Sequence, residues 1–157
     1  MRRSVVILAL LSLACRTGTE PANNVLLGRW VTLQEGLNPQ GSAQWALTFA
    51  ANGRFASEVR TVGVYPGQSS TDVSSYSRVL GTYSLASDKL TVVPDSLIEW
   101  DRFYGPDATP TITSPIPNFR LYDDAHFSIA ASLLILQYTT YPADAPVSTT
   151  RHFTRAN

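Results

Sequence analysis

Apolar and polar residues alternate along much of the chain in short runs with a period of two residues. The clearest run lies at 44–50, where Trp45, Leu47 and Phe49 share one face of a predicted strand. No window repeats its apolar residues every 3.6 positions, and valine, threonine, tyrosine and phenylalanine are abundant. This pattern predicts an all-β protein.

Turn residues divide the alternating runs into short strands. Asn52-Gly53 is the strongest hairpin signal, because both residues tolerate a positive φ. A second hairpin turn is predicted at 86–88. Strands are predicted at 27–33, 44–50, 54–64, 78–85, 89–94, 97–104, 119–122, 126–131, 133–141 and 147–155. About eight to ten strands at this spacing are typical of an up-and-down barrel or a sandwich.

The start of the chain has a different pattern. Met1-Arg2-Arg3 is basic, and residues 5–14 are almost wholly apolar. An apolar helix of about ten residues is roughly 15 Å long, half of a bilayer core, and is too short to span a membrane. A basic start followed by a short apolar run predicts a secretory signal peptide over residues 1–14.

Cys15 is the only cysteine of the chain, so it cannot form an internal disulfide or a thiolate metal cluster. It follows Leu11-Ser12-Leu13-Ala14, and this run resembles the lipobox of bacterial lipoproteins, in which a small residue precedes the cysteine that is lipidated. The lipobox usually has leucine three positions before the cysteine, where this chain has Ser12. The alternative is an ordinary signal peptide that is cut nearby and leaves an unpaired thiol.

The lipobox resemblance implies a membrane anchor on Cys15 and an exported domain. Residues 15–24 are polar and are predicted to be a tether between the lipid and that domain. The residue after Cys15 is Arg16 and not an aspartate. By resemblance to Gram-negative lipoproteins, this favours an anchor in the outer membrane, with the domain facing the periplasm. Several acyl chains on one residue anchor a protein stably, where a single chain does not.

Three motifs follow one another in the exported part. Gly28-Arg29-Trp30 is a Gly-x-Trp, residues 47–55 read Leu-Thr-Phe-Ala-Ala-Asn-Gly-Arg-Phe, and Gly81-Thr82-Tyr83 precedes a hairpin at 88–92. In this order they resemble the lipocalin-like (calycin) barrels of many small bacterial lipoproteins. The resemblance implies that residues 25–157 form a single antiparallel up-and-down β-barrel. The proline-rich segment 105–117 has no counterpart in it.

A barrel needs its open end plugged, and Trp30 on the first strand is predicted to do this. An arginine of the last strand, Arg151 or Arg155, is expected to stack on the indole ring, and Gly28 allows the backbone to approach there. Gly28, Trp30 and Arg155 are therefore expected to stabilise the fold and not to form a binding site.

Large residues on inward faces are the candidate lining of the barrel. They are Trp45, Phe49, Phe55, Tyr83, Trp100, Phe127, Tyr138 and Phe153. An eight-stranded barrel either fills itself with side chains or holds one small ligand. Two functions stay open: a lipid-anchored envelope protein that binds a small hydrophobic ligand inside, and a filled barrel that engages another envelope protein through an exposed patch, in the loops 65–75 or 105–117.

Metal-binding chemistry has little support in the sequence. His126 follows Asp123-Asp124, a combination that can bind a metal ion, but no His-x-x-x-His or other dense ligand set is present. A solvated hairpin turn is the favoured interpretation. We predict no metal and no cofactor.

Catalytic chemistry has little support either. Glu99 and Asp101 are two residues apart on a predicted strand and share one face, about 7 Å apart, similar to the paired carboxylates of glycosidases. Ile98 and Trp100 lie on the opposite face and are predicted to be core, so we expect both carboxylates to point outward into solvent. The sequence has no nucleophile elbow and no phosphate-binding glycine loop. We predict that the protein is not an enzyme.

Charge composition argues against nucleic acid as a partner. The chain has twelve basic and twelve acidic residues, and two of the arginines lie in the predicted signal peptide. Lys89 is the single lysine of the chain. A weakly acidic mature protein of this kind is not typical of nucleic-acid binding.

Overall fold

The computed structural model describes residues 25–38, 41–63, 72–102, 109–117, 119–142 and 145–156. The predicted signal peptide and tether with Cys15, most of the loop 65–75 and part of the segment 105–117 lie outside these residues. The described strands are β1 (Gly28–Asn38), β2 (Gly41–Phe49), β3 (Arg54–Val62), β4 (Val73–Ala86), β5 (Lys89–Asp101), β6 (Thr111–Thr113), β7 (Asp123–Ala130), β8 (Leu133–Thr140) and β9 (Val147–Arg155).

The strands close into an antiparallel barrel. Their order is β4-β3-β2-β1-β9-β8-β7-β5-β6, and an additional pairing of β4 with β5 closes eight of them into a ring. The short β6 lies outside the ring on the edge of β5. The predicted all-β, up-and-down barrel is therefore confirmed.

The two predicted hairpins are present. Gly53 has a φ of 75° and lets β2 turn back into β3, so that Phe49 pairs with Phe55. The second turn joins β4 to β5, where Ala86 pairs with Lys89 and Ser87 has a φ of 59°. The predicted strand at 119–122 is wrong, because these residues form no strand and lead into β7.

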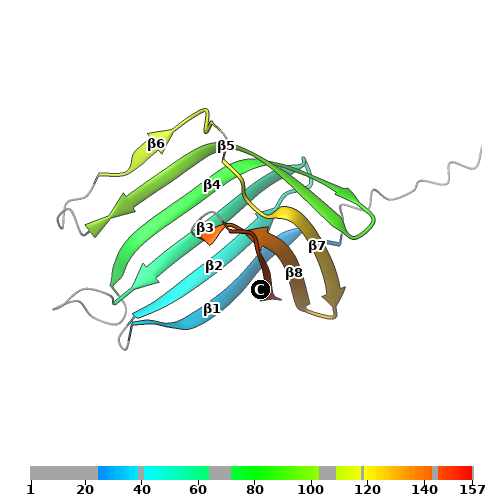
Figure 1. Ribbon diagram of the computed structural model, residues 1–157, viewed down its shortest axis with the longest axis horizontal. Helices are drawn as coiled ribbons and strands as arrows, with labels where there is room; N and C mark the ends of the chain where they lie inside the picture. Colours follow the sequence, from blue (N-terminus) through cyan, green and yellow to red (C-terminus); the bar gives the residue numbers. More distant parts are fainter. Residues whose placement is uncertain are drawn as a thin grey trace, which may run out of the picture.

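The barrel is closed at one end and flared at the other (Figure 1). β9 pairs with β1 only at Trp30↔Arg155 and Val31↔Thr154. β7 pairs with β5 only at the start of β5, where Lys89 and Leu90 lie. The shorter strands β7, β8 and β9 thus close one end of the long sheet β1–β5, which we call the closed end. None of the described strands covers the opposite end of that sheet in this way, and we call it the flared end.

The closed end holds the hydrophobic core. Trp30, Phe49, Phe55 and Phe153 are each at most 2% exposed. Aromatic rings meet edge to face, and the ring centroids of Phe49 and Tyr83 are 5.0 Å apart. Such pairs add about 0.5–1.5 kcal/mol beyond the burial of their area. The sequence predicted these inward positions from the alternation of the strands.

One residue of β5 changes the face of every side chain after it. Gly81 pairs with Pro94 but Leu80 pairs with Ser96, so Asp95 is an extra residue in the strand. Such a β-bulge turns all following side chains to the opposite face. Proline cannot donate to the ladder and is common at such bulges. The two strands predicted at 89–94 and 97–104 are therefore one strand with a bulge.

Because of the bulge, the predicted core position of Trp100 is wrong. Trp100 pairs with Tyr76 on the outer face of the sheet, and the two rings stack with centroids 6.4 Å apart. Ile98 pairs with Arg78 on the same outer face. Glu99 pairs with Ser77, which places it on the inner face instead of the outer one.

Candidate functional site

The residues predicted to line the barrel mostly fill it. Phe49, Phe55, Tyr83, Tyr138 and Phe153 belong to the buried core, and Phe127 is partly buried and packs against it. Trp45 also packs against the core from the inner face and is half-buried. Trp100 is the exception, because it faces outward. The closed end of the barrel is thus a packed core and not a ligand pocket.

Arg155 lies over Trp30 at the seam between β9 and β1. Its Cζ is 4.2 Å from the centroid of the indole ring, and its guanidinium donates hydrogen bonds to the carbonyl oxygens of Leu27 and Val25. Gly28 has a φ of 111°, and a Cβ there would lie 3.2 Å from Nη1 of Arg155. The geometry places these three predicted residues together at one end of the barrel.

The other candidate arginine, Arg151, contacts a different tryptophan ring. Arg151 lies over Trp45, with its Cζ 4.0 Å from the ring centroid. Both arginines come from β9, and both rings come from the sheet that β9 meets. Cation–π contacts of this kind are worth about 0.5–2 kcal/mol each. They hold β9 against β1 and β2 where the backbone pairing is short.

A groove opens on the outer face where β1 and β9 part after Val31 and Thr154; we call it the seam groove. Its volume is about 570 Å³. Its apolar lining consists of Val31, Trp45, Ala46 and Leu133, and its neutral polar lining of Thr32, Gln44, His152 and Thr154. Arg29, Glu58 and Arg60 complete the lining. Trp45 belongs to the inner face, so the groove reaches the edge of the barrel interior at the seam.

The charged lining of the seam groove is organised around Glu58. Ala46 and Arg78 pair with Glu58 across β2, β3 and β4, so all three point to the outer face. Oε2 of Glu58 is 2.8 Å from Nη2 of Arg29, and Oε1 is 3.4 Å from Nε of Arg78. The Glu58 side chain is only 10% exposed. Arg60 lies over the ring of Tyr76, with its Cζ 5.6 Å from the centroid.

This arginine cluster was not predicted from the sequence. Its members lie on β1, β3 and β4, and only the register of three strands brings them together. Alternation alone predicts that Glu58 and Arg60 share a face, because they are two residues apart in a strand. Nothing in the local sequence indicates that Arg29 meets them.

A second cavity lies at the flared end. Its volume is about 560 Å³, and it is lined by Val59, Ser75, Tyr76, Ser77, Glu99, Trp100, Asp101, Thr109 and Thr111. The sequence predicted Glu99 and Asp101 to point outward into solvent. The predicted face was wrong, because the bulge at Asp95 turns both carboxylates to the inner face, but Glu99 is exposed to solvent, as predicted.

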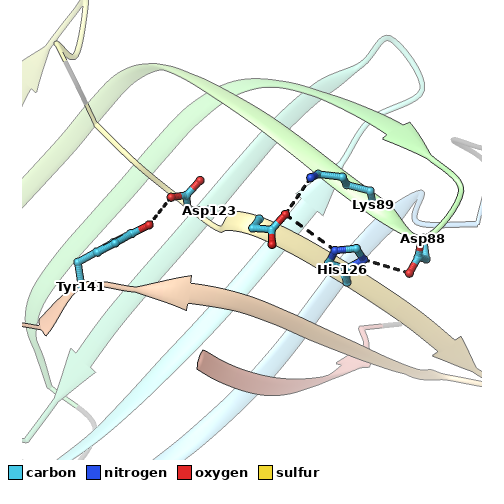
Figure 2. Close-up of polar contacts among 6 residues, drawn as sticks. Asp88, Lys89, Asp123, His126 and Tyr141 are labelled. Carbon is cyan, nitrogen blue, oxygen red and sulfur yellow. Dashed lines mark hydrogen bonds and ion pairs between the residues drawn. The ribbon is translucent and has the colours of Figure 1, made fainter. Parts of the chain in front are cut away.

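Figure 2 shows a third group of polar residues, around His126 at the seam between β5 and β7. Nδ1 of His126 is 3.0 Å from Oδ2 of Asp88, and Nζ of Lys89 is 2.8 Å from Oδ1 of Asp124. The hydrogen bond from His126 lowers the pKa of Asp88. The hydrogen bond between Lys89 and Asp124 lowers the pKa of Asp124 and raises that of Lys89. These contacts tie the β4–β5 turn to β7.

The His126 group is solvated, with the side chains of Asp88 and Asp124 both 65% exposed. Among the residues that the structure describes, no three histidine, cysteine, aspartate or glutamate side chains are placed to hold a metal ion. Tyr141 donates a hydrogen bond of 2.6 Å to Asp123 beside this group (Figure 2). That bond raises the pKa of Tyr141. The geometry is that of a surface clamp across the seam.

No protein-family model matches the chain, and no curated protein is significantly similar to it. Within the described ranges, no helix is long and apolar enough to cross a membrane. The geometry of the two cavities is therefore the basis for a functional proposal.

Proposed function

We propose that the protein is a lipid-anchored lipoprotein of the bacterial cell envelope whose lipocalin-like barrel binds a small hydrophobic ligand in the seam groove. The observation that carries this proposal is the position of the groove beside a filled core. The buried aromatic residues of the closed end leave the ligand no place among them. A groove of about 570 Å³ with an apolar lining lies directly outside.

The size and lining of the seam groove suit a small molecule. Pockets for such ligands have volumes of about 300–1,000 Å³ and apolar walls with a few polar groups. Val31, Trp45 and Leu133 supply apolar surface from β1, β2 and β8. Burial of apolar ligand surface against them contributes about 25 cal/mol per Å². The ligand therefore binds across the β1–β9 seam and not inside the barrel.

The membrane anchor rests on the sequence before residue 25. We propose that residues 1–14 are a signal peptide and that Cys15 is lipidated. The lipid then anchors the protein in the outer membrane, with the barrel facing the periplasm. Arg155 holds Val25 and Leu27 through their carbonyl oxygens. The tether 15–24 thus joins the barrel at its closed end, and about ten extended residues reach up to roughly 35 Å.

A second candidate function is a filled barrel that engages another envelope protein. The packed core is equally consistent with this function, because a barrel that is filled with side chains has no interior space for a ligand. Exposed apolar side chains on the outer face near β5 and β6 are the matching surface, with Ile112 70% exposed and Val93 59% exposed. This candidate places no ligand in the seam groove.

Native mass spectrometry of the protein purified from its own host distinguishes the two. The ligand-binding proposal predicts a retained small molecule that is lost in the variant Trp45→Ala. Trp100→Ala is the matched control, because Trp100 lines the cavity at the flared end and not the seam groove. A bare protein mass that gains nothing from a lipid extract of the host contradicts the ligand and favours the protein partner.

A further inference from the structure

We infer that the ligand of the seam groove carries an anionic headgroup, a carboxylate or a phosphate, which Arg60 and Arg29 bind. The inference rests on the proposed function, because it names the chemistry of that same site. It also gives a role to the one strongly charged part of the groove. Two arginines share one carboxylate, and a third arginine lines the same groove without a carboxylate partner among the described residues; this arrangement carries the inference.

Glu58 does not neutralise the arginines around it. Its two carboxylate oxygens are engaged by Arg29 at 2.8 Å and by Arg78 at 3.4 Å, and only 10% of its side chain is exposed. Arg60 has no carboxylate within ion-pair distance among the described residues. One buried negative charge is thus shared by two guanidinium groups, Arg60 adds a further positive charge to the groove lining, and the wall keeps an excess of positive charge.

The arginines that line the groove also have N–H donors that Glu58 does not use. A guanidinium has five N–H donors, and the contact with Glu58 uses one donor nitrogen of Arg29. Nε of Arg78 is buried, lies 3.4 Å from Oε1 of Glu58 and does not line the groove, so Arg78 holds Glu58 in place and donates nothing to the ligand. Arg60 lies over the ring of Tyr76, and a guanidinium stacked on an aromatic face can still donate hydrogen bonds in its own plane. Carboxylate and phosphate oxygens are the acceptors that such planar donors match.

The contacts of Glu58 make the groove suitable for an anion and not for a cation. A charge-assisted hydrogen bond fixes Arg29 in the lining of the groove before any ligand arrives. A cationic ligand would need Glu58, which is buried and already paired twice. It would also meet the positive charge of Arg60. The wall therefore favours negative charge by Coulomb attraction.

The groove places these donors beside apolar surface. Arg29 and Arg60 line the same cavity as Val31, Trp45 and Leu133. The matching ligand is a single-chain amphiphile, whose hydrocarbon contacts the apolar lining while its headgroup meets the arginines. A fatty acid and an alkyl phosphate both have this chemistry.

Isothermal titration calorimetry of the full-length protein with four probes tests the inference. Octanoate has chain and charge, 1-octanol has the chain alone, acetate has the charge alone, and octyl phosphate separates phosphate from carboxylate. We expect octanoate or octyl phosphate to bind about tenfold or more tightly than octanol, since a hydrogen bond to a charged group is worth that factor. Acetate alone is expected to bind too weakly to detect.

Matched variants locate the headgroup. Arg60→Gln is expected to bring the affinity for octanoate down to that for octanol. Arg54→Gln is the control, because Arg54 lies on the outer face of the same strand but pairs with Asp95 outside the groove. It is expected to keep the preference. Equal binding of octanoate and octanol overturns the anionic headgroup and leaves the proposed function standing, whereas binding of neither probe overturns the proposed function itself.

Discussion

The guanidinium of Arg155 stacks on the indole ring of Trp30, with its Cζ 4.2 Å from the ring centroid, at the seam where β9 meets β1. Only two residue pairs join these strands. The stack and the hydrogen bonds to Leu27 and Val25 therefore supplement a short pairing and help to hold β9 against β1.

Arg155→Gln is expected to lower the free energy of unfolding by about 1–2 kcal/mol, because it removes the cation–π contact and two charge-assisted hydrogen bonds. Urea denaturation followed by tryptophan fluorescence measures the change. Arg54→Gln is the control, since its ion pair with Asp95 is solvent-exposed and worth little. An equal loss of stability in both variants would show that the contacts of Arg155 contribute no more than an exposed ion pair does.

Gly28→Ala is expected to destabilise the barrel by about 1–2 kcal/mol. A side chain at a φ of 111° strains the backbone, and the new Cβ would meet Nη1 of Arg155 at 3.2 Å. The shift of the thermal midpoint measures the loss. Combination with Arg155→Gln relieves the steric contact but not the strain, so the double variant is expected to lose less than the sum of the two. Full additivity would contradict the contact.

The hairpins of this fold could be predicted because their signals are local. Asn52-Gly53 specifies a tight turn, and the alternation of Trp45, Leu47 and Phe49 specifies which face is buried. The face of Trp100 could not be predicted in the same way. It depends on the bulge, and the bulge depends on Pro94 lying opposite a glycine on another strand.

Gly81 explains why that bulge is not a local property of β5. A Cβ at this position would lie 2.3 Å from the carbonyl oxygen of Val93, so only glycine permits the approach of the two strands. The contacts beside the seam groove could not be predicted from local sequence either. Arg29, Glu58 and Arg78 come from three strands, and no pattern within one strand indicates their contact.

The hydrogen bond between Ser57 and Tyr122 crosses the buried interior at 2.9 Å. Burial raises the pKa of Tyr122 above the ordinary tyrosine range. Tyr122→Phe leaves the buried hydroxyl of Ser57 unpaired and is expected to cost about 1–2 kcal/mol of stability. In the double variant with Ser57→Ala, part of that loss is expected to return.

Tyr141→Phe is the control for that prediction, because Tyr141 is exposed and its partner Asp123 stays accessible to water. We expect a change within about 0.5 kcal/mol. A double-mutant cycle in urea denaturation measures the coupling. A coupling of zero between Ser57 and Tyr122 would contradict the buried hydrogen bond.

The clamp around His126 predicts a weaker β5–β7 seam in acid. The pKa values of Asp88 and Asp124 are lowered from 3.8 in the folded protein, so their contribution to stability is present above that value and is lost as the pH falls through the lowered pKa values. The raised pKa of Lys89 has the opposite sign, and its contribution is lost only above 10.5.

Hydrogen exchange at Phe127 reports on this clamp, because its amide donates to the carbonyl oxygen of Asp88 at 2.8 Å across the seam. The protection factor is expected to be lower at pH 3 than at pH 7, and Asp88→Asn is expected to reduce the difference. Protection that is the same at both pH values in the unaltered protein would show that the clamp does not hold the seam.

Intermolecular nuclear Overhauser effects between octanoate and the full-length protein locate the bound ligand. We expect contacts from the octanoate chain to the indole of Trp45 and the methyl groups of Val31 and Leu133 in the seam groove. Contacts to Phe49 and Phe153 in the core, or to Val59 at the flared end, would contradict this position of the ligand.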